Sequence, residues 1–268
     1  MSETCLPPPI THPRRLWEQL KAQGFAVLDA ASVSALAGVD LGQLHALDVD
    51  WATLPADRYL KDGGRYRRRR HACFVVDGAR VERSPHRAHW QPLDYNALHG
   101  GMQRWFEPID PESTARPAWA QLLAWLGAVA CGLRGVETSD LQSPGARPRP
   151  WFAEAHQFRI DTTDGIGRPT PEGAHRDGVD LVAVFLVARE GVKGGETRVF
   201  DAHGPAGQRF TLTEAWSLLL LDDQRVIHES TPIQPLKDGG YRDTLVITLR
   251  AGGFQQEPPV LDAGQMID

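Results

Sequence analysis

Hydrophobic and polar positions follow different spacings in the two halves of the chain. In the first half, apolar residues recur every three or four positions, as on one face of a helix. The helices predicted in this half span residues 13–24, 32–47 and 116–134, and the strands span 25–28 and 65–76. Gly24 is placed to end the first helix, because glycine readily adopts the left-handed conformation of a helix cap. We therefore expect a helix-bearing N-terminal portion over residues 1–149.

The second half consists of short apolar runs separated by turns that contain Gly or Asp. The strands predicted in this half span residues 151–160, 179–188, 196–200, 217–221 and 244–250. A connector rich in proline, residues 143–150, separates them from the first half. Several short strands with turns between them are typical of a β-sandwich or barrel. The expected fold class is mainly β with flanking helices (α+β), and the C-terminal strands form its core.

Composition and charge narrow the range of functions. Hydrophobic residues fill 41% of the 268 positions, which allows a sizeable core and excludes a disordered chain. The 29 basic and 34 acidic residues give a net charge of −5, which provides no general attraction to nucleic acid or anionic lipid. The longest apolar stretch, Leu122–Leu133, is too short to cross a bilayer, and no secretory signal is recognisable. We expect a cytoplasmic protein with neither a nucleic-acid nor a membrane partner.

The chemically most informative pattern is His175-Arg176-Asp177, just before a strand-like run. In an extended segment, residues i and i+2 project from the same face, so His175 and Asp177 can reach one cation. Two ligands alone do not make a metal site, and the pair could instead brace a loop. The three cysteines are widely spaced, so the sequence supports neither a disulfide framework nor a thiolate zinc site.

A third ligand candidate is His228, which follows an apolar strand and the turn at Asp222-Asp223. A jelly-roll barrel brings such strand ends together at one mouth. Two histidines and one carboxylate with open positions opposite them are the ligand set of non-haem Fe(II) oxygenases. Asp222 and Asp223 are alternative ligands, but their position favours a role in the turn.

Arg242 begins the last predicted strand, with Thr244 two positions later on the same face. A buried guanidinium can bind a carboxylate through two parallel hydrogen bonds, and the hydroxyl of Thr244 could add another. The alternative is a surface ion pair between Arg242 and Asp243 or Asp238.

Four segments carry a resemblance to a known family: HRDGVDLV, GGETRVFD, DDQRVIHESTPI and GYRDTLVITL. They resemble the 2-oxoglutarate/Fe(II)-dependent dioxygenases, and within them the bacterial group that includes the L-isoleucine 4-hydroxylases and related free amino-acid hydroxylases. The resemblance is strongest over residues 150–252. It is weaker in the first half, at PADRYLKDGGRYRRRRHACF and YNALHGGMQRWFEP.

The resemblance implies a single dioxygenase domain over residues 1–268, with a double-stranded β-helix (jelly-roll, cupin-like) core over 150–252. The implied iron ligands are His175, Asp177 and His228. Arg242, with Arg250 as a weaker rival, would hold the far carboxylate of 2-oxoglutarate, and Thr244 would assist. The implied cofactors are Fe(II), 2-oxoglutarate and O2, and the co-products are succinate and CO2.

The resemblance also implies a small-molecule substrate, a free L-amino acid with an aliphatic chain such as isoleucine, leucine or methionine. A carboxylate at Asp177 favours hydroxylation over halogenation. Gln157 and Arg159 share one face of a predicted strand and could bind the substrate carboxylate or the cosubstrate, or form a structural ion pair. His156 would then point away from the pocket.

The run Arg65 to His71 is the densest basic segment of the chain. It could belong to a non-catalytic module that binds nucleic acid or an acidic partner. The strand-like pattern favours instead arginines that pair with carboxylates across a sheet or face the mouth of the site. A second alternative function is a metal-dependent jelly-roll enzyme that does not use 2-oxoglutarate.

Overall fold

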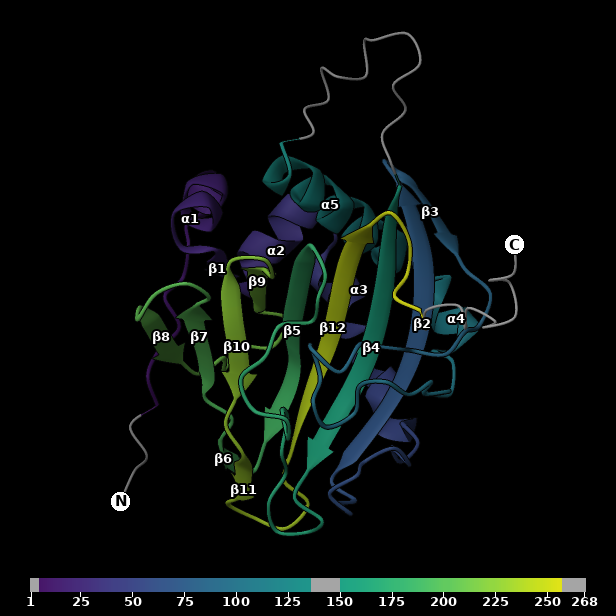
Figure 1. Cartoon of the computed structure of the whole chain (residues 1–268), viewed down its shortest axis with the longest axis vertical. Coiled ribbons are helices and arrows are strands. Elements are labelled where there is room, and N and C mark those ends of the chain that lie inside the picture. Colours follow the sequence, from purple (N-terminus) through teal and green to yellow (C-terminus); the bar gives the residue numbers. More distant parts are fainter. Residues whose placement is uncertain (1–4, 136–149, 257–268) are drawn as a thin grey trace, which may run out of the picture.

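Two β-sheets and a layer of helices make up the computed structural model, which describes residues 5–135 and 150–256 (Figure 1). The helical segments are η1 (Pro13–Arg15), α1 (Leu16–Gln23), α2 (Ala30–Ala37), α3 (Leu41–His45), η2 (Asp48–Thr53), α4 (Pro111–Thr114) and α5 (Pro117–Leu133). The strands are β1 (Phe25–Leu28), β2 (Arg67–Asp77), β3 (Arg80–Arg83), β4 (Trp151–Asp161), β5 (Leu181–Glu190), β6 (Val192–Gly194), β7 (Thr197–Asp201), β8 (Gly207–Phe210), β9 (Leu218–Asp222), β10 (Val226–Ser230), β11 (Ile233–Pro235) and β12 (Tyr241–Ala251). Most of the predicted connector, residues 143–149, lies outside the described residues.

The larger sheet has seven strands in the order β1-β9-β5-β12-β4-β2-β3, and all neighbouring pairs are antiparallel. A smaller sheet has the order β10-β7-β8, and β11 and β6 form a separate pair. Apolar residues of both sheets, among them Val182, Leu219, Val199 and Phe210, pack into one buried cluster. Burial of these side chains holds the two sheets together.

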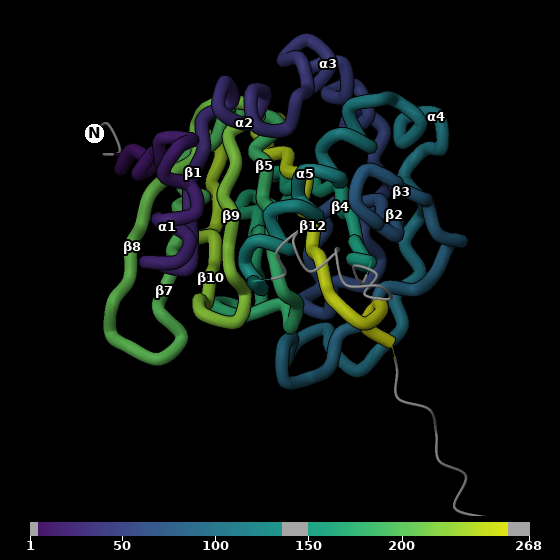
Figure 2. The backbone as a smooth tube through the Cα atoms, turned by 90° about the horizontal axis from the view of Figure 1, so that it is seen from above, coloured from purple at the N-terminus to yellow at the C-terminus, as the bar shows by residue number. Residues whose placement is uncertain are grey.

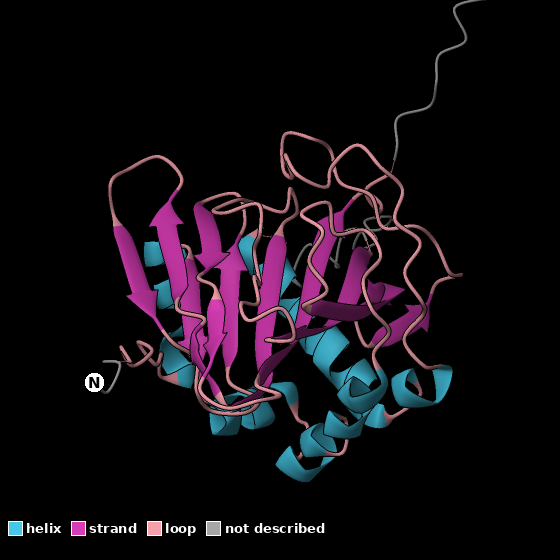
Figure 3. Ribbon diagram, turned by 90° about the horizontal axis from the view of Figure 1, so that it is seen from below, coloured by secondary structure: helices cyan, strands magenta, loops and turns pink. Residues whose placement is uncertain are grey.

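The helices lie on one side of the large sheet (Figure 3). The longest, α5, places Leu122 and Leu126 in a buried cluster with Leu245 and Ile247 of β12. In the described part of the chain, no helix is long and apolar enough to span a membrane. The segment between β3 and α4 runs on the side of the sheet away from α2 and α3 (Figure 2). The helices therefore do not cover that side of the sheet, and a site can form between the sheet and this segment.

The predicted fold class, mainly β with flanking helices, is confirmed, but two details were wrong. The helix predicted over 32–47 is two helices, because Gly38 ends α2 with a φ of 66° and the Asp40 side chain caps α3. The sheet also crosses the predicted boundary of the core, since β1, β2 and β3 all belong to it. The N-terminal half thus helps to build the sheet that carries the site.

Candidate functional site

A cavity lies over one face of the central strands β2, β4 and β12. Residues directly opposite one another on antiparallel strands point to the same face. The rows whose residues line the cavity include Arg67–Ile160–Arg242, Arg69–Phe158–Thr244 and His156–Val246. The loop between β4 and β5, strand β10 and the segment between β3 and α4 complete its lining.

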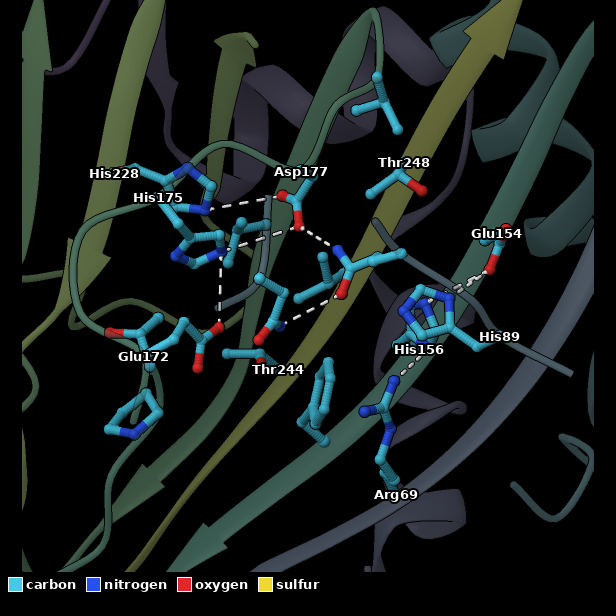
Figure 4. A pocket seen from close by; sticks show the side chains of 18 of the residues that line it. Arg69, His89, Glu154, His156, Glu172, His175, Asp177, His228, Thr244 and Thr248 are labelled. Carbon is cyan, nitrogen blue, oxygen red and sulfur yellow. Dashed lines mark hydrogen bonds and ion pairs between the residues drawn. The ribbon is translucent and has the colours of Figure 1, made fainter. Parts of the chain in front are cut away.

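His175, Asp177 and His228 meet at one end of this cavity, as their spacing predicted. The backbones of His175 and His228 form a bridge, in which each N–H donates to the carbonyl of the other at 3.0 and 2.9 Å. The Asp177 carboxylate oxygens lie 3.7 Å from His175 Nε2 and 3.8 Å from His228 Nε2. Figure 4 shows the three side chains pointing toward one another. Ligands at about 2.1 Å from a shared metal lie about 3–4 Å apart, so this group fits one cation.

Neighbouring groups hold the ligand atoms in place. The Nδ1–H of His175 donates to the Gly173 carbonyl at 3.0 Å, which leaves Nε2 free to bind a metal. The carboxylate of Asp223 accepts the backbone N–H groups of Asp177, Gly178 and Val179 at 2.9, 2.8 and 3.0 Å. Asp223 therefore anchors the ligand loop, a function that its predicted turn role did not include.

The charges of the three side chains depend on one another. Burial alone would raise the pKa of Asp177, but His175 and His228 outweigh burial and lower it. Burial opposes the charged form of His175, but Asp177 raises its pKa to about 10, while burial and the nearby His175 lower the pKa of His228 to about 4. Without a metal, His175 thus carries the positive charge beside Asp177. A bound metal cation would replace that proton.

The opposite end of the cavity holds a second polar cluster around Glu154 (Figure 4). The Glu154 carboxylate accepts hydrogen bonds from His71 Nε2 at 3.0 Å and His89 Nδ1 at 2.6 Å, and Arg69 donates to His156 Nδ1 at 2.7 Å. By distance alone these three histidines and Glu154 could hold a metal. However, the bond from Arg69 requires the proton of His156 to sit on Nε2, which blocks the nitrogen nearest Glu154. We therefore interpret this group as a hydrogen-bonded cluster.

The predicted substrate-binding residues Gln157 and Arg159 do not line the cavity. Their row partners across β4 and β12 are Leu245 and Asp243, on the helix side of the sheet. Arg159 forms two hydrogen bonds with Asp243, at 2.8 and 2.7 Å, which is the structural ion pair of the alternative interpretation. The prediction reversed the two faces of β4, since it is His156 that points into the cavity.

Arg242 and Thr244 lie in the cavity on one face of β12. Arg242 is buried, and its Nε has no hydrogen-bond partner among the described residues. Burial and the neighbouring Arg189 lower its pKa to about 10, so it stays charged at neutral pH. The rival Arg250 also lines the cavity but donates to the Gly253 carbonyl at 2.8 Å. The role of Arg242 and Thr244 in holding a cosubstrate stays a prediction.

Sequence reasoning missed the segment between β3 and α4, which contributes Gln91 and Arg104. Gln91 Nε2 donates to Asp177 Oδ1 at 3.2 Å, and its Oε1 accepts from Arg104 Nη2 at 2.9 Å. This segment has no helical or strand periodicity that would identify its inward residues. The available signal was the weak family resemblance at YNALHGGMQRWFEP, which contains Arg104.

The basic run is distributed between the two faces of β2. Arg67 and Arg69 are buried and share Asp57, at 2.7 and 3.8 Å. Arg68 contacts Asp161, on β4, at 3.3 Å. This arrangement agrees with arginines that pair with carboxylates and face the site, and it leaves no continuous basic strand on the surface.

Comparisons with known proteins agree with this geometry. Residues 49–248 match the family described as 2OG-Fe dioxygenase. A bsmA homolog from Methylobium petroleophilum PM1 is 51% identical, over 93% of this chain and 97% of that chain, with a TM-score of 0.84. No curated protein matches the chain.

Two more distant crystal structures show the fold alone. IDO from Bacillus thuringiensis is 16% identical, over 94% of this chain and 98% of that chain, with a TM-score of 0.69. The Fe(II)/(alpha)ketoglutarate-dependent dioxygenase TqaL is 21% identical, over 89% and 87%, with a TM-score of 0.64. The two-sheet core is thus the double-stranded β-helix that the sequence predicted.

Proposed function

Since the chain belongs to the 2OG-Fe dioxygenase family, whose members use Fe(II), 2-oxoglutarate and O2, we propose that it hydroxylates a free L-amino acid. An aliphatic side chain, as in isoleucine, leucine or methionine, would be hydroxylated at an unactivated C–H bond, with succinate and CO2 as co-products. The observation that carries the proposal is one cavity with three convergent ligands, His175, Asp177 and His228, and an unpaired buried cation, Arg242.

The donor set fits a ferrous ion, because imidazole nitrogens and one carboxylate oxygen suit Fe(II) and leave other coordination positions open. The bound iron would supply O2 activation coupled to the decarboxylation of 2-oxoglutarate. According to the family resemblance, a carboxylate ligand at the position of Asp177 favours hydroxylation over halogenation. Asp223 keeps the ligand loop in position through its three backbone hydrogen bonds.

Arg242 would bind the far carboxylate of 2-oxoglutarate. Its guanidinium is buried, charged and directed into the cavity, and Thr244 adds a hydroxyl on the same face of β12. The lining of the cavity also includes apolar side chains that suit an aliphatic chain. These are Phe152, Val179, Val184, Val246 and Phe254.

The experiment is a succinate-release assay with Fe(II), ascorbate and 2-oxoglutarate across the twenty amino acids, with products analysed by mass for a gain of one oxygen. We expect stimulation by at least one aliphatic amino acid. Arg242→Met should raise the KM for 2-oxoglutarate by about 100-fold, because it removes a buried charged partner. Arg65→Met is the matched control, since this arginine is exposed and pairs with Asp164.

Two results would contradict the proposal. Succinate release that no amino acid stimulates would remove the amino-acid substrate. Activity that does not depend on 2-oxoglutarate, and that Arg242→Met leaves unchanged, would favour the alternative of a metal-dependent jelly-roll enzyme without this cosubstrate.

A further inference from the structure

Two buried arginines in the cavity lack an anionic partner. Within residues 5–135 and 150–256, the buried arginines are Arg67, Arg69, Arg104 and Arg242. The first two share Asp57, whereas Arg104 and Arg242 have no described carboxylate within 4.0 Å. A buried charge is costly unless an opposite charge compensates it. If 2-oxoglutarate pairs with Arg242, Arg104 can still pair with a second anionic ligand.

Arg104 is held so that it faces the cavity. Its backbone forms a bridge with that of His89, at 3.0 and 2.9 Å, and both side chains line the cavity. It is 2% exposed, and its one side-chain hydrogen bond to a described residue goes to the neutral amide oxygen of Gln91. Its Nε–H and one terminal nitrogen of Arg67, Nη2, have no partner among the described residues. Free N–H donors thus coincide here with a positive charge that has no described carboxylate in contact.

Glu172 is a carboxylate in the same cavity that has a buried oxygen without a partner in the described part of the chain. Its side chain is 11% exposed, and the buried oxygen is Oε2. Its other oxygen, Oε1, lies 3.7 Å from His175 Nε2. If His175 binds a metal through that nitrogen, Glu172 loses this partner. The carboxylate then faces the cavity without a cation of the protein in contact.

The two charges lie near each other without touching. Glu172 is among the carboxylates whose charge acts on Arg104, yet no ion pair joins them within 4.0 Å. A ligand that carries both a negative and a positive group would fit between them and compensate both. 2-Oxoglutarate has no positive group, so its charges match Arg242 but not Glu172.

We propose that Arg104 and Glu172 bind the two charged groups of an α-amino acid substrate, with the carboxylate on Arg104 and the ammonium group on Glu172. This assignment rests on the proposed function and adds to it the residues that select the substrate class. The guanidinium offers paired N–H donors to the carboxylate, and Glu172 accepts from the ammonium group. The substrate side chain is then free to extend along the apolar walls.

The test compares three ligands: the amino acid that the wild-type protein hydroxylates, its carboxamide, which lacks the carboxylate, and its 2-hydroxy acid, which lacks the ammonium group. The wild type should prefer the amino acid over each analogue by about 100-fold in kcat/KM, because each analogue leaves one buried charge unpaired. Arg104→Met should reduce the preference over the carboxamide to about threefold or less and keep the preference over the hydroxy acid. Glu172→Gln should give the reverse pattern.

The preference is a ratio of two kcat/KM values measured on the same variant. A general loss of activity, for example from a shift of Gln91 that weakens the iron site, lowers both values equally and leaves the ratio unchanged. Calorimetry with Fe(II) and 2-oxoglutarate in the absence of O2 provides a readout besides turnover. In this titration, Arg104→Met should raise the Kd for the amino acid by about 100-fold. The control Arg65→Met should match the wild type in both measurements.

Three outcomes would overturn the assignment, and they differ from one another. If the wild type hydroxylates an amino acid but both variants keep the wild-type ratios, the assignment is wrong and the proposed function stands. If 2-oxoglutarate turns over but no amino acid stimulates it, the amino-acid substrate of the proposed function is wrong and the assignment fails with it, while the use of 2-oxoglutarate stands. If 2-oxoglutarate does not turn over at all, the proposed function itself is wrong.

Discussion

The histidine cluster around Glu154 should make the folded protein sensitive to mild acid. Burial lowers the pKa of His89 from its ordinary value of 6.5 to about 4, although the adjacent Glu154 favours its charged form. Burial likewise lowers the pKa of His71 and His156. Between pH 6.5 and 4, the unfolded chain therefore binds protons that the folded chain excludes. The stability that the neutral, buried histidines contribute to the folded state is fully present above pH 6.5 and is lost as the pH falls toward 4.

The size of the effect follows from the pKa shift. One pKa unit corresponds to about 1.4 kcal/mol, and pH 5 lies 1.5 units below the ordinary pKa of His89. His89 alone should therefore cost about 2 kcal/mol of unfolding free energy between pH 7.5 and 5.0. His71 and His156 add losses of the same sign.

The measurement is urea unfolding at pH 7.5 and 5.0 for the wild type and for His89→Asn, whose side-chain amide can replace the Nδ1–H donated to Glu154. The variant should lose about 2 kcal/mol less than the wild type over this interval. His203→Gln, in an exposed turn, is the control and should lose as much as the wild type. An equal loss in His89→Asn and the wild type would refute a neutral, buried His89.

Three further predictions concern other parts of the site. Asp223→Asn removes an acceptor for the loop that carries Asp177 and should weaken Fe(II) binding about 10-fold in a calorimetric titration, and an unchanged affinity would contradict this. Gln157→Leu removes two buried polar atoms that lack described partners and should raise the unfolding free energy by about 1 kcal/mol, with a decrease as the refuting result. Asp57→Asn leaves its two arginine partners buried and unpaired and should cost about 3–5 kcal/mol in urea unfolding, whereas a loss below about 1 kcal/mol would show that solvent compensates them.

The meeting of His175, Asp177 and His228 was predicted correctly, although His175 and Asp177 lie in the loop between β4 and β5 and not in a strand. His228 lies on β10, and an isolated backbone bridge joins it to His175 of that loop. The prediction depended on the two-residue separation of His175 and Asp177 and on the position of His228 after an apolar strand. The backbone conformation of single positions was harder to predict, since Gly38 divided a helix that the apolar pattern alone made continuous.

The rest of the cavity lining was poorly predicted for two physical reasons. The face of β4 depends on the register with β2 and β12, and a shift of one residue exchanges the roles of His156 and Gln157. Arg104 lies outside regular structure, where a backbone bridge to His89 sets its direction. Neither the register nor that bridge is visible in the pattern of apolar positions.

Both halves of the chain contribute residues to the lining of the cavity. The candidate ligands His175, Asp177 and His228 lie in the C-terminal half together with Arg242, and the motifs of this half resemble the 2-oxoglutarate/Fe(II)-dependent dioxygenases. Arg104 comes from the N-terminal half, which reaches the site through β2 and the segment after β3. The candidate metal ligands therefore come from the C-terminal half, whereas the two proposed substrate contacts, Arg104 and Glu172, come one from each half. A relative that keeps the C-terminal motifs but lacks an arginine at the position of Arg104 should perform the same chemistry on a different substrate.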